Sequence, residues 1–323
     1  MRILITGAAG FVGIHLMTML SGKNEVIGVD NFKHNVDPRY LEDQHLFCYH
    51  AIKYADCAVN FETAANFKDL DAIVHLAATI NVDYSVEEPW QSLYNNIIGT
   101  LNVAETCRKH DLKMIHASTC EVYGSNVDER KPQAEDHPLR PFSPYGASKL
   151  AGEKICESYT DTYGMKINVL RPFNIFGTYQ RGSSYGAAIS IFTNRVLAGE
   201  PPEIFGDGYQ TRDYTYIPDI LQAYNIALKR DFGGKPVNFG SGREVTINEL
   251  ASTICKLCGR ADIEPVHVKP RVRELRRSWC DDGRARIEFG YKPVYFLEKG
   301  LEEFIKWRKS IEGLDYFKNF VLG

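Results

Sequence analysis

The fold is decided by one stretch near the amino terminus, Arg2-Ile-Leu-Ile-Thr-Gly7-Ala-Ala-Gly10-Phe-Val-Gly13. Its apolar first half is typical of a buried strand, and the strand breaks at Gly7. A helix is expected from Phe11 to Leu20. Glycines at these spacings permit a tight turn, close approach of a pyrophosphate and close packing of helix on strand. The stretch therefore predicts a strand–turn–helix unit that binds a dinucleotide.

The next expected strand, 25–30, ends at Asp30, where an acid accepts hydrogen bonds from an adenosine ribose. Its carboxylate repels a 2′-phosphate, and the following Asn31-Phe32 offers no adjacent arginine. We therefore expect NAD rather than NADP. The residues expected to contact it here are Gly7, Gly10, Phe11, Val12, Gly13, Asp30 and Asn31.

Strands and helices alternate along the first half of the chain. Further strands are expected at 46–50, 72–77, 114–118 and 166–171, and long helices at 89–109 and 143–163. This order is typical of an α/β fold with a Rossmann-type, doubly wound parallel sheet. After about residue 174 the elements become short. We expect an NAD-binding domain over 1–174 and a smaller C-terminal substrate-binding lobe over 175–323, with some return to the sheet near 214–240 and a cleft between them.

The composition excludes several classes of protein. The 323 residues carry a net charge of −3, which gives no basic field for nucleic acid or an anionic membrane. No apolar run reaches the ~18 residues of a membrane span, and Met1-Arg2 leads straight into a strand, so we expect no signal peptide and a cytoplasmic protein. The eight cysteines are scattered. Cys255-Lys-Leu-Cys258 lies in an apolar helical run without a second such pair, so we expect packing and no metal site.

Lys149 follows Tyr145 by about one helical turn, in Tyr145-Gly-Ala-Ser-Lys149 on the expected helix 143–163. An ammonium beside a phenol lowers the pKa of the phenol, which makes the tyrosine a usable base near neutral pH. The preceding strand runs into Ser118-Thr119-Cys120-Glu121, which places a hydroxyl, a thiol and a carboxylate side by side. We therefore expect a tyrosine-based oxidoreductase with further acid–base groups within reach.

These motifs resemble those of the extended short-chain dehydrogenase/reductases of the NAD-dependent nucleotide-sugar epimerase/dehydratase family. The resemblance covers nearly the whole chain and rests on GxxGxxG at 7–13, His75-Leu-Ala-Ala78, Asn96-Ile-Ile-Gly-Thr100, STxEVYG at 118–124, SPYxxSK at 143–149, Arg171-Pro-Phe-Asn174 and Gly206–Asp213. It implies a tightly held NAD that is reduced and reoxidised within one turnover, and a homodimer built on the two long helices. It adds to the cofactor site Leu76, Ala77, Ala78, Asn96, Tyr145 and Lys149.

In this family the tyrosine, here Tyr145, takes the proton of the sugar C4 hydroxyl while hydride passes from C4 to NAD⁺. The resemblance implies that Lys149 binds the nicotinamide ribose and that Thr119 hydrogen-bonds the reacting oxygen. A 4-ketone acidifies the C5 proton, which Glu121 is placed to remove. Because 4-epimerases usually lack this glutamate, the resemblance favours a 4,6- or 5,6-dehydratase acting on a nucleotide-diphosphate hexose or hexosamine.

Cys120 stands where hexose 4,6-dehydratases usually have an aspartate that protonates the departing C6 hydroxyl. A thiol with a pKa of about 8.5 is protonated at neutral pH and can act as that acid. The Cys120-Glu121 pair also resembles that of UDP-apiose/xylose synthases and of dehydratases that leave a 5,6-exocyclic alkene. The open alternatives are a 4-epimerase, a UDP-glucuronate decarboxylase or apiose-type enzyme, a catalytically silent NAD-binding regulator, and a Cys120 that merely fills space.

On the substrate side, the resemblance implies that Asn174, Arg212 and Arg271 bind the diphosphate, to which guanidinium groups suit well. The alternative for the run 271–277 is a solvated basic surface. The hexose is expected near Arg181 and Tyr185.

Two further features concern the nucleotides. The run Arg276-Arg-Ser-Trp-Cys-Asp281 resembles that of UDP-sugar enzymes, which favours a UDP-sugar. The family usually has Gly-Asp-Ile after the third strand, with the aspartate near the adenine. The matching stretch here is His50-Ala51-Ile52, so we expect the adenine to be held in another way.

Overall fold

The computed structural model describes residues 1–33, 52–124, 130–180, 188–271 and 275–310. A seven-stranded sheet lies at its centre, with all neighbouring strands parallel, in the order β11-β6-β5-β4-β1-β2-β3. The inner strands β1 and β4 are near-continuous apolar runs because both faces of a parallel sheet are covered. They are β1 (Arg2–Thr6), β2 (Glu25–Asp30), β3 (Ile52–Tyr54), β4 (Ala72–His75), β5 (Lys113–Ala117), β6 (Ile167–Pro172) and β11 (Val237–Phe239).

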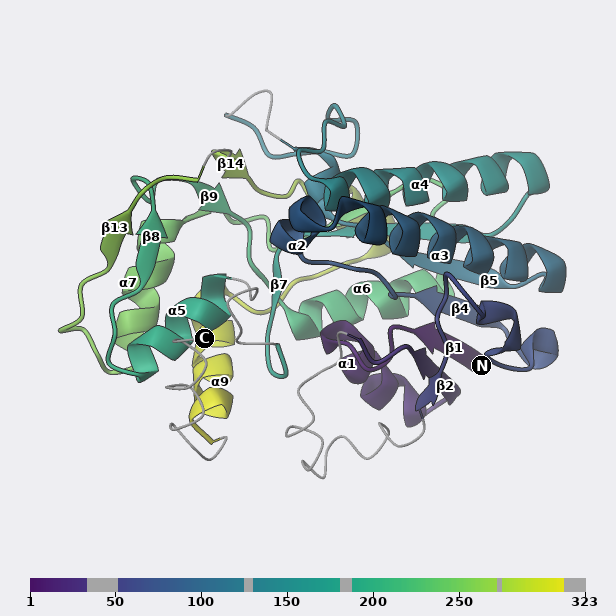
Figure 1. The fold of residues 1–323 in the computed structure, drawn as a ribbon, viewed down its shortest axis with the longest axis horizontal. Helices are drawn as coiled ribbons and strands as arrows, with labels where there is room; N and C mark the ends of the chain where they lie inside the picture. Colours follow the sequence, from purple (N-terminus) through teal and green to yellow (C-terminus); the bar gives the residue numbers. More distant parts are fainter. Residues whose placement is uncertain (34–51, 125–129, 181–187, 272–274, 311–323) are drawn as a thin grey trace.

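Helices cover both faces of this sheet, which confirms the doubly wound α/β fold (Figure 1). On one side α3 (Pro89–His110) and α4 (Pro144–Tyr163) pack along each other, with the short α2 (Val82–Glu87) at their amino ends. On the other side α1 (Phe11–Ser21) packs beside α6 (Ile217–Lys229). Short 3₁₀ helices occupy Phe61–Thr63, Phe67–Asp69 and Cys120–Val122.

The start of α4 is set by local sequence. Ser143 is its N-cap and accepts a hydrogen bond from the backbone N–H of Gly146 at 3.0 Å, while Pro144 occupies the first helical position. The helix ends at Gly164, which adopts φ +67°, a conformation that glycine takes without strain. These signals fix the register with which Tyr145 and Lys149 face the sheet.

Apart from α6, β11 and α8, which packs on β11, the second half of the chain lies beyond the carboxyl ends of the main strands (Figure 1). Its β9 pairs with β12 and β14, its β8 pairs with β13, and β10 pairs with β7. The elements are α5 (Ala188–Leu197), α7 (Ile247–Leu257), α8 (Gly283–Phe289), α9 (Leu297–Ser310), β7 (Ile175–Phe176), β8 (Glu203–Phe205), β9 (Thr211–Arg212), β10 (Thr215–Tyr216), β12 (Val245–Thr246), β13 (Val266–Val268) and β14 (Arg277–Ser278).

Two features of the chain bear on the expected domains and strands. Strand β11 returns to the main sheet and pairs with β6, although it belongs to the second half of the chain. The expected strand at 46–50 lies outside the described residues, and the strand that pairs with β2 is β3. Among the described helices, none is both long and apolar enough to span a membrane.

Candidate active site

The glycine turn between β1 and α1 leaves no room for side chains. Gly7 has φ +68°, and a Cβ there would lie 2.8 Å from the backbone nitrogen of Ala77. A Cβ on Gly13 would lie 2.2 Å from the carbonyl oxygen of Gly7. Gly10, the N-cap of α1, has no side chain to cap the helix. The first backbone N–H groups of α1 are therefore suited to receive an anion such as a pyrophosphate, as the sequence predicts.

Asp30 connects this turn to the end of β2. Its Oδ2 accepts a hydrogen bond from the N–H of Ala9 at 2.9 Å, and its Oδ1 accepts one from Phe32 at 2.7 Å. The carboxylate is 9% exposed. It thus lies at the carboxyl end of the second strand beside the glycine turn, where the ribose of a dinucleotide is expected.

Asp56 is a residue that the sequence reasoning missed. The match with His50-Ala51-Ile52 placed the end of the third strand too early, because Ile52 begins β3 and Tyr54 pairs with Asp30. His50 and Ala51 lie outside the described residues. Asp56 follows the strand, and its Oδ2 accepts a hydrogen bond from the Asn31 amide at 3.1 Å. An acid after β3 therefore does lie next to the end of β2.

The segment after β4 is held from both sides. The Thr6 hydroxyl accepts hydrogen bonds from the N–H groups of Leu76 and Ala77, each at 3.2 Å. The buried Asn96 amide accepts from the N–H of Thr79 at 2.7 Å and donates to the Ser148 hydroxyl at 2.8 Å. Asn96 thus ties the segment that contains Ala78 to α4, next to Lys149.

The residues expected to carry the chemistry come together where β5 ends and α4 begins. Thr119 Oγ1 accepts a hydrogen bond from the N–H of Glu121 at 3.2 Å and so caps the 3₁₀ helix Cys120–Val122. The side chain of Tyr145 is hydrogen-bonded to Thr119 and lies in the electrostatic field of Glu121 and Cys120. A hydroxyl therefore contacts the phenol, and a thiol and a carboxylate lie close enough to act on it electrostatically.

Burial dominates the acid–base properties of this group. It raises the pKa of Tyr145, and the hydrogen bond from Thr119 opposes the rise only in part. The expectation of a phenol pKa lowered by Lys149 is therefore wrong, because loss of hydration outweighs the lowering by Thr119. Burial also lowers the pKa of Lys149 to about 8 and raises that of Cys120 to about 12. The Cys120 thiol is accordingly protonated at neutral pH.

The residues expected to bind a diphosphate lie in two places. Asn174 and Arg212 lie close to Cys120: the backbone of Asn174 hydrogen-bonds to its sulfur, and the charge of Arg212 favours its thiolate. The Arg212 guanidinium also donates to the carbonyl of Leu275 at 2.7 Å. Arg271 is exposed and lies over the ring of Phe205 at 4.6 Å. Outside the described residues lie Arg181 and Tyr185.

Known proteins share both the sequence and the fold of this chain. Residues 3–240 match the NAD dependent epimerase/dehydratase family. The chain is 36% identical to a putative UDP-glucose 4-epimerase of Methanocaldococcus jannaschii, over 95% of this chain and 98% of the relative. Its fold matches the UDP-glucose 4-epimerase of Thermotoga maritima, with a TM-score of 0.84, 33% identity and coverage of 97% and 100%.

A second solved structure carries the other activity of the family. The dTDP-glucose 4,6-dehydratase of Streptomyces venezuelae, crystallised with NAD, has a TM-score of 0.87 and 28% identity, with coverage of 96% of this chain and 98% of that one. The glycine turn, Asp30 and the group around Tyr145 fit the same cofactor. The chain therefore belongs to the NAD-dependent epimerase/dehydratase family and is an enzyme whose cofactor is NAD.

Proposed function

We propose that the enzyme dehydrates a nucleotide-diphosphate hexose or hexosamine through a 4-keto intermediate. The observation that carries this proposal is the position of Glu121 and Cys120 on the same turn as Thr119, within the electrostatic reach of the Tyr145 phenol. Oxidation at C4 needs only Thr119, Tyr145 and Lys149. A carboxylate and a protonated thiol at the same place supply the base and the acid for a second step.

Each side chain has one task in this reaction. Bound NAD⁺ supplies a hydride acceptor and a positive charge beside the reacting centre. Tyr145 accepts the proton of the C4 hydroxyl, Thr119 hydrogen-bonds the same oxygen, and we assign Lys149 to the nicotinamide ribose. Glu121 then accepts the proton from C5. The Cys120 thiol donates a proton to the departing C6 hydroxyl, which leaves as water. In a 4,6-dehydratase the hydride taken from C4 would return to C6 while Glu121 returns a proton to C5, and in a 5,6-dehydratase it would return to C4 while Tyr145 returns the proton to the C4 oxygen. Either way the net change is the loss of one water molecule.

The relatives and two groups near Cys120 support a choice of substrate. The relatives named above act on UDP-glucose or dTDP-glucose. Asn174 and Arg212 lie close to Cys120, and we assign the diphosphate to them, with a UDP-sugar favoured. Arg271 is proposed as a second arginine, with Arg181 and Tyr185 near the hexose. We also assign the adenine end of NAD to Asn31 and Asp56.

A 4-epimerase is the second candidate, and the names of the relatives favour it. Such an enzyme returns hydride to the opposite face of the ketone and leaves the C5 proton in place. It uses Thr119, Tyr145 and Lys149 in the same way but gives no task to Glu121. The carboxylate within electrostatic reach of the phenol is therefore the observation that favours dehydration.

One experiment separates the two. UDP-hexoses and dTDP-glucose are incubated with the enzyme in D₂O, and the products are analysed by NMR. Loss of the C6 hydroxyl with deuterium from solvent in the product supports dehydration. A product with inverted C4 and no deuterium overturns dehydration in favour of epimerisation.

A further inference from the structure

An ion pair is buried directly behind the turn that carries Thr119, Cys120 and Glu121. Glu153 lies on α4 one turn after Lys149, and Arg171 lies on β6; each side chain is 3% exposed. Arg171 binds the carboxylate through two nitrogens, Nε to Oε1 at 2.8 Å and Nη2 to Oε2 at 2.6 Å. Such bidentate geometry restricts both side chains to one relative orientation.

The pair holds both ends of the turn. The hydroxyl of Ser118, which precedes Thr119, donates a hydrogen bond to Glu153 Oε1. At the other end, the Tyr123 hydroxyl accepts a hydrogen bond from Arg171 Nη1 at 2.9 Å, and the guanidinium lies 4.8 Å from the centre of the Tyr123 ring. The 118–123 turn is thus fixed to α4 and β6 by residues that precede and follow its reactive groups.

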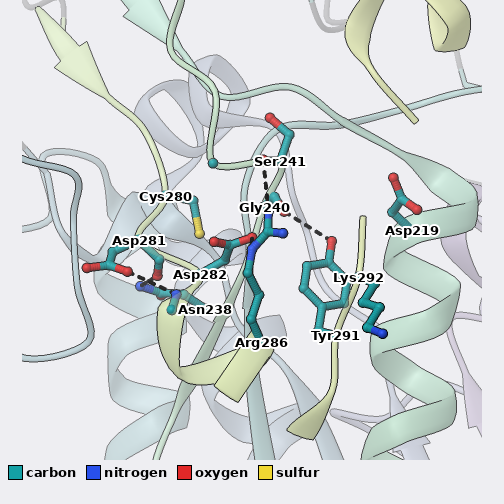
Figure 2. A network of polar contacts seen from close by, with 12 residues as sticks. Asp219, Asn238, Gly240, Ser241, Cys280, Asp281, Asp282, Arg286, Tyr291 and Lys292 are labelled. Carbon is teal, nitrogen blue, oxygen red and sulfur yellow. Dashed lines mark hydrogen bonds and ion pairs between the residues drawn. The ribbon is translucent and has the colours of Figure 1, made fainter. Parts of the chain in front are cut away.

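The same contacts continue into the second half of the chain. The Tyr123 hydroxyl donates to Asn238 Oδ1 at 2.6 Å, on β11. The amide nitrogen of Asn238 donates to the carbonyl oxygen of Gln133 at 2.9 Å. It also donates to the carbonyl oxygen of Asp281 at 3.3 Å (Figure 2). The turn is therefore tied to the segment that continues from β14, whose partner strand β9 carries Arg212.

The pair also contributes to the charge around Lys149. The Glu153 carboxylate and Cys156 raise the pKa of Lys149 against the lowering by burial. His75 on β4 and His116 on β5 are neutral because burial lowers the pKa of both, and the nearby Lys149 ammonium lowers these pKa values further. Loss of the Glu153 charge therefore lowers the pKa of Lys149 further.

We propose that Glu153 and Arg171 are positioning residues that hold Thr119, Cys120 and Glu121 in register with Tyr145 and Lys149. The inference rests on the proposed oxidation at C4, which dehydration and epimerisation share. Neither residue is assigned contact with the reacting atoms. An error of about 1 Å in such a register costs on the order of 10²-fold in rate.

The test uses Arg171→Lys, Glu153→Gln and the double variant Glu153→Gln/Arg171→Met, which leaves no buried charge unpaired. Asn168→Ala is the matched control, since Asn168 is also buried on β6 but bonds to Ala227, Arg230 and Phe232 at the opposite end of the strand. Each holoenzyme is measured for bound NAD, melting temperature, cofactor reduction by substrate as a function of pH, and hydrogen exchange in residues 118–123.

The double variant is expected to retain NAD, to reduce it on the order of 10²-fold more slowly, and to exchange the 118–123 amides faster. In Glu153→Gln the pKa of Lys149 falls, so the loss of rate at alkaline pH is expected to begin at a lower pH. The control Asn168→Ala is expected to change only the melting temperature. The proposal is overturned if the double variant has the wild-type rate and the wild-type hydrogen exchange. If the double variant does not fold, the same two measurements are made on Arg171→Lys. Absence of cofactor reduction in the wild type refutes the proposed function instead, and hydrogen exchange still reports on the positioning.

Discussion

Gly7 and Ala77 approach so closely that a Cβ on Gly7 would lie 2.8 Å from the backbone nitrogen of Ala77. Gly7 also adopts φ +68°, where side chains are strained. Gly7→Ala is therefore expected to displace the glycine turn or the segment after β4, both of which border the NAD site. We predict loss of most bound NAD and a lower melting temperature, measured by cofactor release and thermal denaturation.

Gly22→Ala is the matched control for this prediction. Gly22 follows the other end of α1 and adopts an α-helical φ of −68°, and a Cβ added there would meet no atom within 4 Å. The variant should retain NAD at the wild-type level. Equal NAD retention by both variants would show that the close approach at Gly7 does not shape the cofactor site.

Glu121 and Cys120 are expected to act after oxidation at C4. In Glu121→Gln the amide cannot accept the C5 proton, so we predict that NADH still forms while solvent exchange at C5 falls by roughly 10²-fold or more. Cys120→Ala should retain exchange at C5 but slow the loss of the C6 hydroxyl. Absorbance of the reduced cofactor and NMR in D₂O measure the two steps separately. Wild-type exchange in Glu121→Gln removes this carboxylate from the mechanism.

The sequence predicted the parts of the site that rest on local patterns. The apolar run before Gly7 predicts a strand from its own residues, and the spacing of Tyr145 and Lys149 predicts that both lie on one face of a helix. The structure has this strand, and both residues are buried on α4. Asp56 was missed because β3 has only three residues, two of them exposed, and therefore shows no apolar pattern. Such a strand is recognised only through its pairing with β2.

The burial of charged side chains could also not be predicted from the sequence. Glu153 follows Tyr145 and Lys149 at helical spacing and so belongs to the same face of the helix, but a glutamate there is usually exposed to solvent. Its burial depends on Arg171, which comes from another element. The raised pKa of Tyr145 has the same origin, because the loss of hydration is set by the packing of α4 against the sheet.

Exposed aromatic side chains on α3 bear on the oligomeric state. Trp90 is 78% exposed and stacks on Tyr94, and we propose that this helix and α4 form a homodimer interface. Trp90→Glu should weaken the dimer by roughly 30-fold or more, as expected for an interface tryptophan. Sedimentation velocity measures the change. Ile287→Glu on α8, at another highly exposed apolar residue, is the control and should leave association unchanged. A wild-type monomer at micromolar concentration excludes the proposed interface.

Asp213, which follows Arg212, makes the stability of the enzyme depend on pH. The side chain is fully buried and accepts hydrogen bonds from the N–H and hydroxyl of Ser241 at 2.9 and 2.6 Å, and from the N–H groups of Gly242 and Cys280. Burial nevertheless raises its pKa to about 6, from an ordinary value of 3.8. Between these values the native state binds more protons than the unfolded chain, so the contribution of Asp213 to stability falls as pH rises.

Asp213→Asn removes this titration, while its loss of accepted hydrogen bonds is independent of pH. The difference in unfolding free energy between wild type and variant should therefore decrease by on the order of 3 kcal/mol between about pH 4 and pH 7, since one pKa unit corresponds to about 1.4 kcal/mol. Urea denaturation at several pH values measures it. The control Asp207→Asn replaces an exposed carboxylate paired with Arg276 and keeps Asp213. The fall in stability that comes from Asp213 should therefore still be seen in this variant. A pH-independent difference for Asp213→Asn would mean that the buried carboxyl does not titrate in this range.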